Sequence, residues 1–275
     1  MPELPEVETI SRQLKKDIVG KKIVGTKINF KKPIGKISVA DFKKLTEGSE
    51  IKNVGRRAKL VLIHLSNGQT LIVHLKMTGR LLFVENEVSP NKHTHIIFNF
   101  SDGGKLFFED WRKFGYVKII PTKSLDDFFT CEKYGPEPLD KKFTAKVLKE
   151  LLAKKSKKKI KPLLMDQAFI AGIGNIYAAE ACFCAKISPE RPAGMIKAGE
   201  VKKLHDCIIK ILKLAISKHG SSVEAYVDSE GKKGGFVPFL KVYDRVGEKC
   251  FRCGGKIKEI RLGGRSTSFC PKCQK

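Results

Sequence analysis

The stretch CFRCGGKIKEIRLGGRSTSFCPKC, residues 250 to 273, carries two Cys-x-x-Cys pairs separated by sixteen residues. Each pair can present two thiolates on a tight turn, and the spacer suits a β-hairpin that brings the pairs together. Four thiolates complete a tetrahedral site and leave no position for a catalytic water, so the metal would stabilise the fold. We predict one structural zinc ion with four ligands: Cys250, Cys253, Cys270 and Cys273. The hairpin would display Arg261 and Arg265 as a DNA-probing finger requires, although ordinary solvated positions are the alternative.

The other cysteines, at positions 131, 182, 184 and 207, show no pair spacing. They are predicted to be scattered thiols of the core. Both groups of cysteines fit a reducing cytoplasm better than a disulfide scaffold.

The composition indicates a polyanionic partner. The 275 residues are enough for one large or two medium domains, and 54 Lys and Arg against 29 Asp and Glu give a formal net charge of +25. Such a charge favours binding to a phosphate backbone; the alternative is a lysine-rich protein with no such partner. No apolar run has the length of a membrane span, and the N-terminus lacks a signal-peptide core, so we expect a cytoplasmic protein without a membrane partner.

The first half of the chain is predicted to be mainly β-structure after one helix. Val7, Ile10, Leu14 and Ile18 recur at helical spacing. Between Lys21 and Ile120, short apolar or alternating runs are separated by turn signals: KLVLIHL, QTLIVHLKM, HIIFNF, KLFFED and GYVKII. At least five strands with hairpin-length connections indicate an antiparallel sandwich or barrel.

The second half is predicted to be mostly α-helical. The proline pair in YGPEP, residues 134–138, indicates a linker, after which Phe143, Val147 and Leu151 recur at helical spacing, as do residues from Val201 to Ala215. Ten lysines lie between 141 and 161, most simply as a solvated helix face. Residues 220–239 have no clear period and are either a disordered insert or a functional loop. The predicted domains are 1–130, a linker 131–142, 143–244 and the finger 245–275.

The opening MPELPEVETI is only partly explained by a helix start. Pro5 suits the first turn of a helix, and Glu6 and Glu8 suit its positive end. Pro2 and Glu3 have no such explanation.

Four motifs together resemble the formamidopyrimidine-DNA glycosylase family: MPELPEVET at 1–9, RRAK at 56–59, IAGIGNIYAAE at 170–180 and the four-cysteine finger. The resemblance runs from Pro2 to Gln274. It implies an α+β fold with an N-terminal antiparallel β-sandwich and helix, and a helical helix-two-turn-helix domain with a zinc-finger hairpin. It also implies a bacterial base excision repair enzyme that is a DNA glycosylase and AP lyase, excises oxidised purines such as 8-oxoguanine and formamidopyrimidines from damaged double-stranded DNA, and works as a monomer associated with the nucleoid.

The resemblance also assigns catalytic roles. After removal of Met1, Pro2 would present a secondary amine that attacks the sugar C1′ and gives a cationic iminium, the state from which elimination proceeds. Glu3 is the adjacent acid and base, with Glu6 in a supporting role. Lys59 takes part in β-elimination, and Arg265 binds phosphate and is linked to δ-elimination.

Seven further residues are expected to contact DNA. A flipped base leaves a space in the duplex, which the family fills with three side chains matching Met77, Arg112 and Phe114. From the residues alone, Met77 and Phe114 would more often be core positions. The remaining DNA contacts implied by the family are His74, His93, Lys161 and Asn175.

Two positions depart from the family pattern. Trp111 stands where proline is usual before Arg112, and Asp244 stands where VYDR usually reads VYGR. Two other functions are compatible with part of the sequence. An endonuclease VIII-like glycosylase for oxidised pyrimidines usually starts PEGPE and commonly lacks the three-residue wedge. A non-catalytic zinc-ribbon DNA-binding protein leaves Pro2, Glu3 and Lys59 without a purpose.

Overall fold

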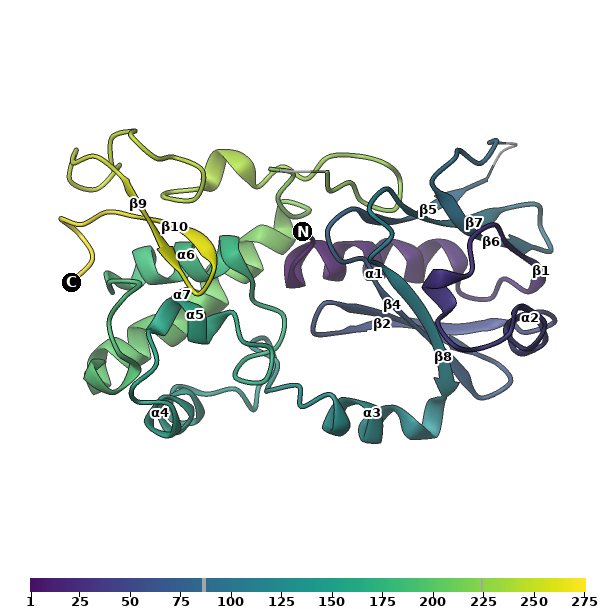
Figure 1. Ribbon diagram of the computed structural model, residues 1–275, viewed down its shortest axis with the longest axis horizontal. Coiled ribbons are helices and arrows are strands. Elements are labelled where there is room, and N and C mark those ends of the chain that lie inside the picture. Colours follow the sequence, from purple (N-terminus) through teal and green to yellow (C-terminus); the bar gives the residue numbers. More distant parts are fainter. Residues whose placement is uncertain (86–87, 224) are drawn as a thin grey trace. The chain divides into compact units, whose positions relative to one another are not determined.

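The chain divides into two compact units. The computed structural model describes residues 1–85, 88–223 and 225–275. The sandwich unit comprises Met1–Glu132 and Lys218–Gly235, and the helical unit comprises Lys133–Ser217 and Phe236–Lys275 (Figure 1). The helices and the finger, predicted as two domains, therefore group together in one unit.

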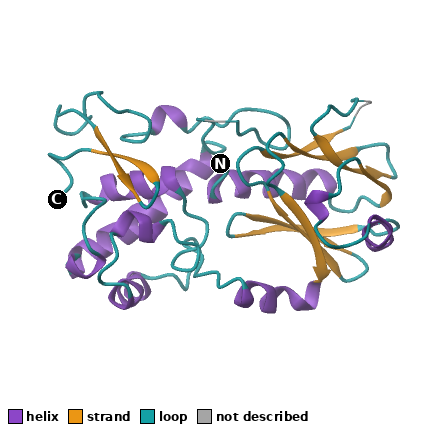
Figure 2. Ribbon diagram, viewed as in Figure 1, coloured by secondary structure: helices purple, strands orange, loops and turns teal. Residues whose placement is uncertain are grey.

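Two four-stranded antiparallel sheets form the sandwich unit (Figure 2), with strand orders β1-β6-β7-β5 and β2-β3-β4-β8. The strands are β1 (Ile23–Ile28), β2 (Ile51–Arg57), β3 (Leu60–Leu65), β4 (Gln69–His74), β5 (Gly79–Val84), β6 (Thr94–Phe100), β7 (Lys105–Asp110) and β8 (Tyr116–Pro121). Around them lie α1 (Leu4–Ile18), η1 (Lys32–Ile34), α2 (Val39–Thr46), η2 (Thr122–Ser124) and α3 (Leu125–Cys131). The antiparallel sandwich with an N-terminal helix is confirmed.

The helix α1 completes the core of the sandwich. Val7, Ile10, Leu14 and Ile18, the four residues predicted to form its apolar face, have no exposed surface. The helix contacts β2 and β3 of one sheet and β5 of the other (Figure 1). Because its apolar face is buried among both sheets, the start of α1 has a defined place in the fold.

The strands missed by the sequence pattern are all at sheet edges. The five predicted runs form β3, β4, β6, β7 and β8. The unpredicted β1, β2 and β5 each occupy an edge position. Polar residues are common on edge strands because they discourage pairing with other chains, and they blur the apolar alternation. In IVGTKI of β1 and IKNVGRR of β2, polar residues interrupt the apolar alternation in this way.

The helical unit contains four α-helices, two short 3-10 helices and the finger hairpin. Its elements are α4 (Ala145–Lys154), α5 (Ile160–Leu164), α6 (Asn175–Ala185), η3 (Ala193–Met195), α7 (Ala198–Ser217), η4 (Val237–Phe239), β9 (Lys258–Leu262) and β10 (Arg265–Phe269). The buried face of α4 is Leu148 and Leu152, one residue beyond the predicted Val147 and Leu151. The predicted helical period is confirmed, and Val147 and Leu151 are half-buried. The most buried positions lie one residue later because Val-Leu and Leu-Leu pairs fit two adjacent faces of a helix.

The segment 218–235 belongs with the sandwich, whereas the predicted boundaries gave it to the helical domain. The side chain of Gln13 on α1 donates to Asp228 at 2.8 Å and accepts the N–H of Ser229 at 3.2 Å. The N–H of Phe83 donates to the carbonyl of Ser229 at 3.0 Å. Residue 224 lies outside the described residues. The hydrogen bonds of Asp228 and Ser229 hold the described part of 220–235 against α1 and β5, which favours a functional loop over a disordered insert.

The prediction of scattered core thiols was wrong for three cysteines, and the expectation that this group fits a reducing compartment without disulfides was wrong for two of them. Cys184 of α6 and Cys207 of α7 form a disulfide with a Cα–Cα distance of 5.8 Å, and Cys131 is exposed. Among the described residues outside the four-cysteine group, Cys182 alone is a buried free thiol, and burial raises its pKa to about 12. A pairing across 23 residues is invisible in sequence because it depends on how α6 and α7 pack.

Candidate active site and metal centre

Two glutamates organise the start of α1. Glu3 is the N-cap residue and forms a capping box with Glu6, whose Oε2 accepts the N–H of Glu3 at 2.8 Å. The other carboxylate oxygen, Oε1 of Glu6, accepts the N–H of Ser221 at 2.8 Å. Pro2, Glu3 and Glu6 are all buried. Glu6 therefore links the backbone beside Pro2 to the segment 218–235.

A chain of contacts ties the turn that carries Lys59 to α1. Ala58, in the left-handed region with a φ of 53°, follows the last residue of β2 and precedes Lys59. Arg56 donates to the carbonyl of Ala58 and, through Nε, to Oε2 of Glu8, both at 2.8 Å. Burial opposes ionisation of Glu8, but Arg56 and then Arg12 outweigh it and hold the pKa of Glu8 below its usual value. Lys59 is only 6% exposed, so the turn holds it within the sandwich unit.

His74, at the end of β4, is a neutral imidazole. Burial, with smaller contributions from the cations Lys76 and Lys59, lowers the pKa of His74 to about 3. Its Nδ1 accepts the N–H of Lys76 at 2.9 Å, and its ring centroid lies 5.5 Å from that of Tyr116. The proton of the neutral ring is therefore on Nε2, which can donate to a phosphate oxygen.

The predicted wedge residues Arg112 and Phe114 lie on one exposed loop between β7 and β8. The guanidinium of Arg112 lies 5.2 Å from the centroid of the Phe114 ring, which is 53% exposed. A core position for Phe114 is therefore excluded. Met77 is half-buried and lies between β4 and β5.

Asp110 holds this loop, and no sequence pattern singled it out. Its carboxylate accepts the N–H groups of Phe114 and Gly115, both at 2.7 Å, and that of Arg112 at 3.2 Å. It also accepts the hydroxyl of Thr78 at 2.5 Å, and it is fully buried. Charge-assisted bonds of this kind are short and strong, so the backbone that presents Arg112 and Phe114 is rigid.

In the helical unit, Lys161 is buried rather than displayed. It has no exposed surface, and its Nζ donates to the side chains of Asn175 and Thr267, the latter at 3.0 Å. Asn175 begins α6, and Thr267 lies on β10. Lys161 thus connects the first turn of α6 to the finger hairpin, whereas its place in a lysine-rich run suggested a solvated face.

The turn before α6 is closed by Gln167. Its side chain accepts the N–H of Gly172 and donates to the carbonyl of Ile173, both at 2.8 Å. Gly172 has a φ of 91°, a conformation that favours glycine. The N-terminus of α6 follows this turn, and N–H groups at a helix N-terminus are suited to bind a phosphate.

The four finger cysteines form a preorganised metal site. Their sulfur atoms all lie within 4.8 Å of one another, with Cys253 and Cys270 at 3.5 Å and Cys250 and Cys273 at 3.9 Å. A tetrahedral zinc with sulfur ligands at about 2.3 Å places its ligands about 3.8 Å apart, which matches this spacing. The residues therefore fit one structural zinc ion.

The finger presents Arg265 at the tip of its hairpin. Gly263 and Gly264, with φ values of 55° and 75°, form the two-residue turn between β9 and β10. Arg265 is the first residue of β10 and is exposed, opposite Leu262. The finger packs through Cys250, Ile257 and Cys270 on Ala179 and Phe183 of α6. Its position on the helical unit thus depends on the fold around the metal site.

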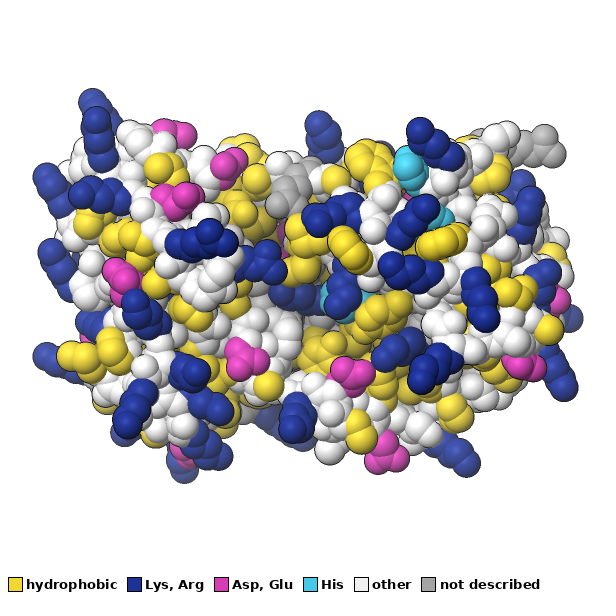
Figure 3. Space-filling model, viewed as in Figure 1, with side chains coloured by type: hydrophobic (Ala, Val, Ile, Leu, Met, Phe, Trp, Pro, Cys, Tyr) yellow, Lys and Arg dark blue, Asp and Glu magenta, His cyan; other side chains and the backbone are white. Residues whose placement is uncertain are grey.

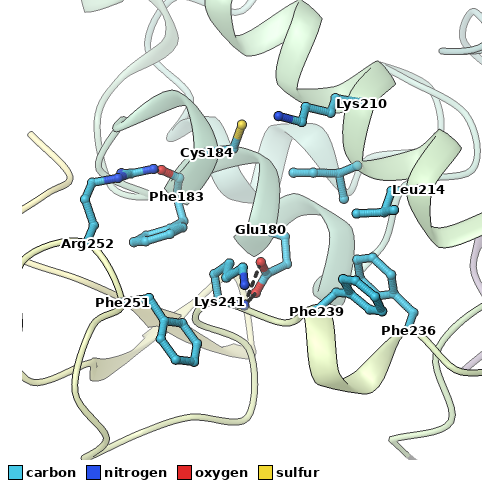
Figure 4. A pocket seen from close by; sticks show the side chains of 11 residues that line it. Glu180, Phe183, Cys184, Lys210, Leu214, Phe236, Phe239, Lys241, Phe251 and Arg252 are labelled. Carbon is cyan, nitrogen blue, oxygen red and sulfur yellow. Dashed lines mark hydrogen bonds between the residues drawn. The ribbon is translucent and has the colours of Figure 1, made fainter. Parts of the chain in front are cut away.

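Glu180 of α6 is a second buried carboxylate that the sequence did not reveal. It accepts the N–H groups of Lys241, Val242 and Tyr243 at 2.9–3.0 Å, at the base of an apolar pocket of about 390 Å³ (Figure 4). Burial raises the pKa of Glu180, and the three N–H donors oppose that rise. The next residue, Asp244, has a φ of 58°, which accounts for the glycine expected there.

On the face shown in Figure 3, cations are more frequent than anions. Lys and Arg side chains are spread over the visible face, with few Asp and Glu among them (Figure 3). The excess of 54 basic over 29 acidic residues is therefore present at the surface, where it attracts polyanions. In the part of the chain that the structure describes, no helix is long and apolar enough to span a membrane.

An antiparallel sandwich entered by a helix, followed by a helical unit that carries a four-cysteine hairpin, is the architecture expected of a zinc-finger DNA glycosylase. Three family models match successive parts of the chain. Residues 1–117 match the model of the formamidopyrimidine-DNA glycosylase N-terminal domain, 134–227 that of its H2TH domain, and 247–275 the zinc finger found in FPG and IleRS. The chain belongs to the formamidopyrimidine-DNA glycosylase family, whose members are base excision repair enzymes.

Individual relatives are similar over their full lengths. The formamidopyrimidine-DNA glycosylases of Pelotomaculum thermopropionicum and Streptococcus mutans are 45% and 46% identical, over all of this chain and 99% and 100% of their own. A Lactococcus lactis FPG mutant in complex with Fapy-dG containing DNA has a TM-score of 0.94 at 39% identity, covering both chains fully. The same organism's enzyme with abasic-site DNA has a TM-score of 0.93 at 39% identity, covering 99% of each chain.

Proposed function

We propose that this chain is a bifunctional DNA glycosylase and AP lyase that excises oxidised purines from duplex DNA through an N-terminal proline Schiff base, followed by β,δ-elimination. It acts as a monomer on the bacterial chromosome in the cytoplasm. The observation that carries the proposal is that Pro2 and Glu3 are both buried at the start of α1, where Glu6 accepts the N–H of Glu3. The complexes of similar enzymes with Fapy-dG and abasic-site DNA support the same substrate class.

The amine of Pro2 becomes available when Met1 is removed. A terminal amine with a pKa of about 7.7–8 is roughly a tenth unprotonated at neutral pH, whereas a lysine at about 10.4 is almost wholly protonated. The amine attacks C1′ as the oxidised base departs, and Glu3 protonates the ring oxygen of the sugar. The product is a cationic iminium, which acidifies C2′ and permits loss of the 3′ phosphate and then the 5′ phosphate.

The remaining site residues serve these steps on DNA. Lys59 assists β-elimination and binds phosphate, and Arg265 binds phosphate and assists δ-elimination. Met77, Arg112 and Phe114 fill the space left by the flipped nucleotide, with Arg112 donating to the orphaned base. His74, His93 and Asn175 contact the backbone. Lys161 acts by positioning Asn175 and the finger, because its ammonium is enclosed.

The nucleophile is tested with matched proline variants. Parent protein incubated with an 8-oxoguanine duplex should leave phosphate on both sides of a one-nucleotide gap, and borohydride should trap a covalent adduct. Pro2→Gly should lose most cutting of the oxidised purine and most of the adduct. Pro5→Ala, which changes the other proline of the opening, should keep both. Full-rate cutting by Pro2→Gly, or no adduct with the parent, would show that Pro2 is not the nucleophile.

The same assay separates the other functions. A duplex with thymine glycol tests oxidised-pyrimidine specificity, and faster cutting of that duplex than of 8-oxoguanine would indicate the endonuclease VIII-like activity. Binding without cleavage of any damaged duplex would indicate a non-catalytic DNA-binding protein.

A further inference from the structure

Trp111 is a large aromatic residue left at the surface beside the proposed wedge. Its side chain is 49% exposed, and it immediately precedes Arg112. An indole buries a large apolar area in a core, so one that remains half exposed on a rigid loop is suited to an external partner. The Asp110 contacts hold this loop, so its exposure is a property of the fold.

The indole is supported from within the protein. The guanidinium of Arg80 lies 4.7 Å from the centroid of the Trp111 ring, a cation–π arrangement, and the His93 ring centroid lies 5.9 Å away with the planes tilted by 49°. Arg80 on β5 also donates to the carbonyl of Ala225 at 3.1 Å. Trp111 therefore has an orientation set by Arg80, which also contacts the segment 218–235.

We propose that Trp111 forms a stacking site for a nucleobase of the damaged duplex, next to the space filled by Met77, Arg112 and Phe114. The proposal rests on the proposed function, because it requires the wedge loop to meet DNA. Arg80 covers one ring face and the His93 ring lies at 5.9 Å, but 49% of the Trp111 surface is exposed and can meet a base. Aromatic side chains bind unstacked bases irrespective of sequence, because every base has a π-face. Trp111 would thus help to hold the kinked duplex open without reading its sequence.

The chain contains one tryptophan, so its fluorescence reports on this site alone. Titration with an abasic-analogue duplex should change the emission of Trp111 and protect it from acrylamide quenching. Trp111→Ala should bind that duplex about tenfold more weakly, since stacking contributes on this scale per base. Trp111→Phe should retain most of the affinity. Val24→Ala removes exposed apolar surface from β1 of the same unit and should bind like the parent. Unchanged melting temperatures would show that the variants fold.

Independent measurements separate this proposal from the function on which it rests. The stacking site alone would be overturned by three results together. The parent binds the abasic duplex in a gel shift, its emission and quenching do not change, and Trp111→Ala binds with the affinity of the parent. Protected fluorescence without a borohydride adduct would support stacking and contradict the nucleophile. Absence of any DNA binding in the gel would overturn both.

Discussion

At the scale of single residues, Asp110 is the clearest case of a side chain that acts through others. A buried carboxylate is costly unless its lone pairs are used, and four donors use those of Asp110. Asp110→Asn keeps the shape but replaces one acceptor oxygen by a donor, facing N–H groups that then lack a partner. We expect this variant to lose about 2–3 kcal/mol of unfolding free energy.

In Asp110→Asn, the loss of affinity for DNA should exceed the loss of folding stability. With its loop loosened, Asp110→Asn should bind an abasic duplex more weakly than the parent at a temperature where both are folded. Asp127→Asn, an exposed substitution in α3, is the matched control and should change neither urea unfolding nor binding. Parent-like binding by Asp110→Asn would mean that loop rigidity is irrelevant to recognition.

His74 makes stability depend on pH. Its pKa is 6.5 in an unfolded chain and about 3 in the folded protein, so between these values the unfolded state binds the extra proton. Stability is therefore lost as the pH falls from 6.5 towards 3, with a slope from this residue of up to about 1.4 kcal/mol per pH unit.

The measurement is urea unfolding at a series of pH values. His74→Gln cannot titrate, so its acid sensitivity should be smaller than that of the parent within this window. The zinc thiolates also titrate in acid, but they are common to both proteins and cancel in the comparison. His219→Asn, a substitution at an exposed histidine, is the control for loss of a surface imidazole. Identical slopes for His74→Gln and the parent would mean that His74 titrates normally.

At the scale of elements, the disulfide between α6 and α7 predicts the number of free thiols. Six of the eight cysteines are free, so denatured, zinc-stripped protein should react with six equivalents of a thiol reagent, and with eight after reduction. The link closes a loop of 23 residues, and its loss should cost about 3 kcal/mol. Reduced protein and Cys184→Ser should melt at similar, lower temperatures, while Cys131→Ser should melt like the parent. Eight thiols before reduction would contradict the link.

Elements with strong periodicity were predictable, and contacts across the fold were not. The apolar stripe of α1 and the central strands follow from residues a few positions apart, because a helix face or strand face is a local property. Lys161 is indistinguishable from its neighbours in a lysine run until α5, α6 and β10 enclose it. Asp110 and Glu180 are likewise defined only by backbone N–H groups that the fold brings to them.

The residues of the candidate site likewise include some that a local pattern predicts and others that it does not. The zinc ligands follow from cysteine spacing, because the chemistry needs four thiolates at a short separation. Pro2 and Glu3 have no periodic or spacing signal, and their assignment depended on resemblance. The structure adds the hydrogen bonds around these residues: Glu6 binds the backbone of Glu3, and Arg56 connects Glu8 to the turn before Lys59.

At the scale of the whole molecule, the net charge of +25 predicts a strong salt dependence of DNA binding. Each phosphate neutralised by a cation releases counterions, so the logarithm of the binding constant falls with the logarithm of salt concentration by about 0.9 per contact. The slope therefore reports the number of cations that contact phosphates. That number is far smaller than the net charge of the chain. The slope also distinguishes a displayed cation from a buried one.

Arg265 and Lys161 are the pair that tests this distinction. Arg265 is exposed at the tip of the finger, so Arg265→Ala should weaken binding and reduce the slope by about one. Lys161 has no exposed surface and holds Asn175 and Thr267, so Lys161→Met should weaken binding while leaving the slope unchanged. Lys36→Ala, an exposed cation outside the proposed contacts, is the control for loss of charge alone and should alter neither quantity. Equal reductions in slope for Arg265→Ala and Lys161→Met would mean that Lys161 meets phosphate directly, because only a cation that displaces counterions from DNA can change the salt dependence.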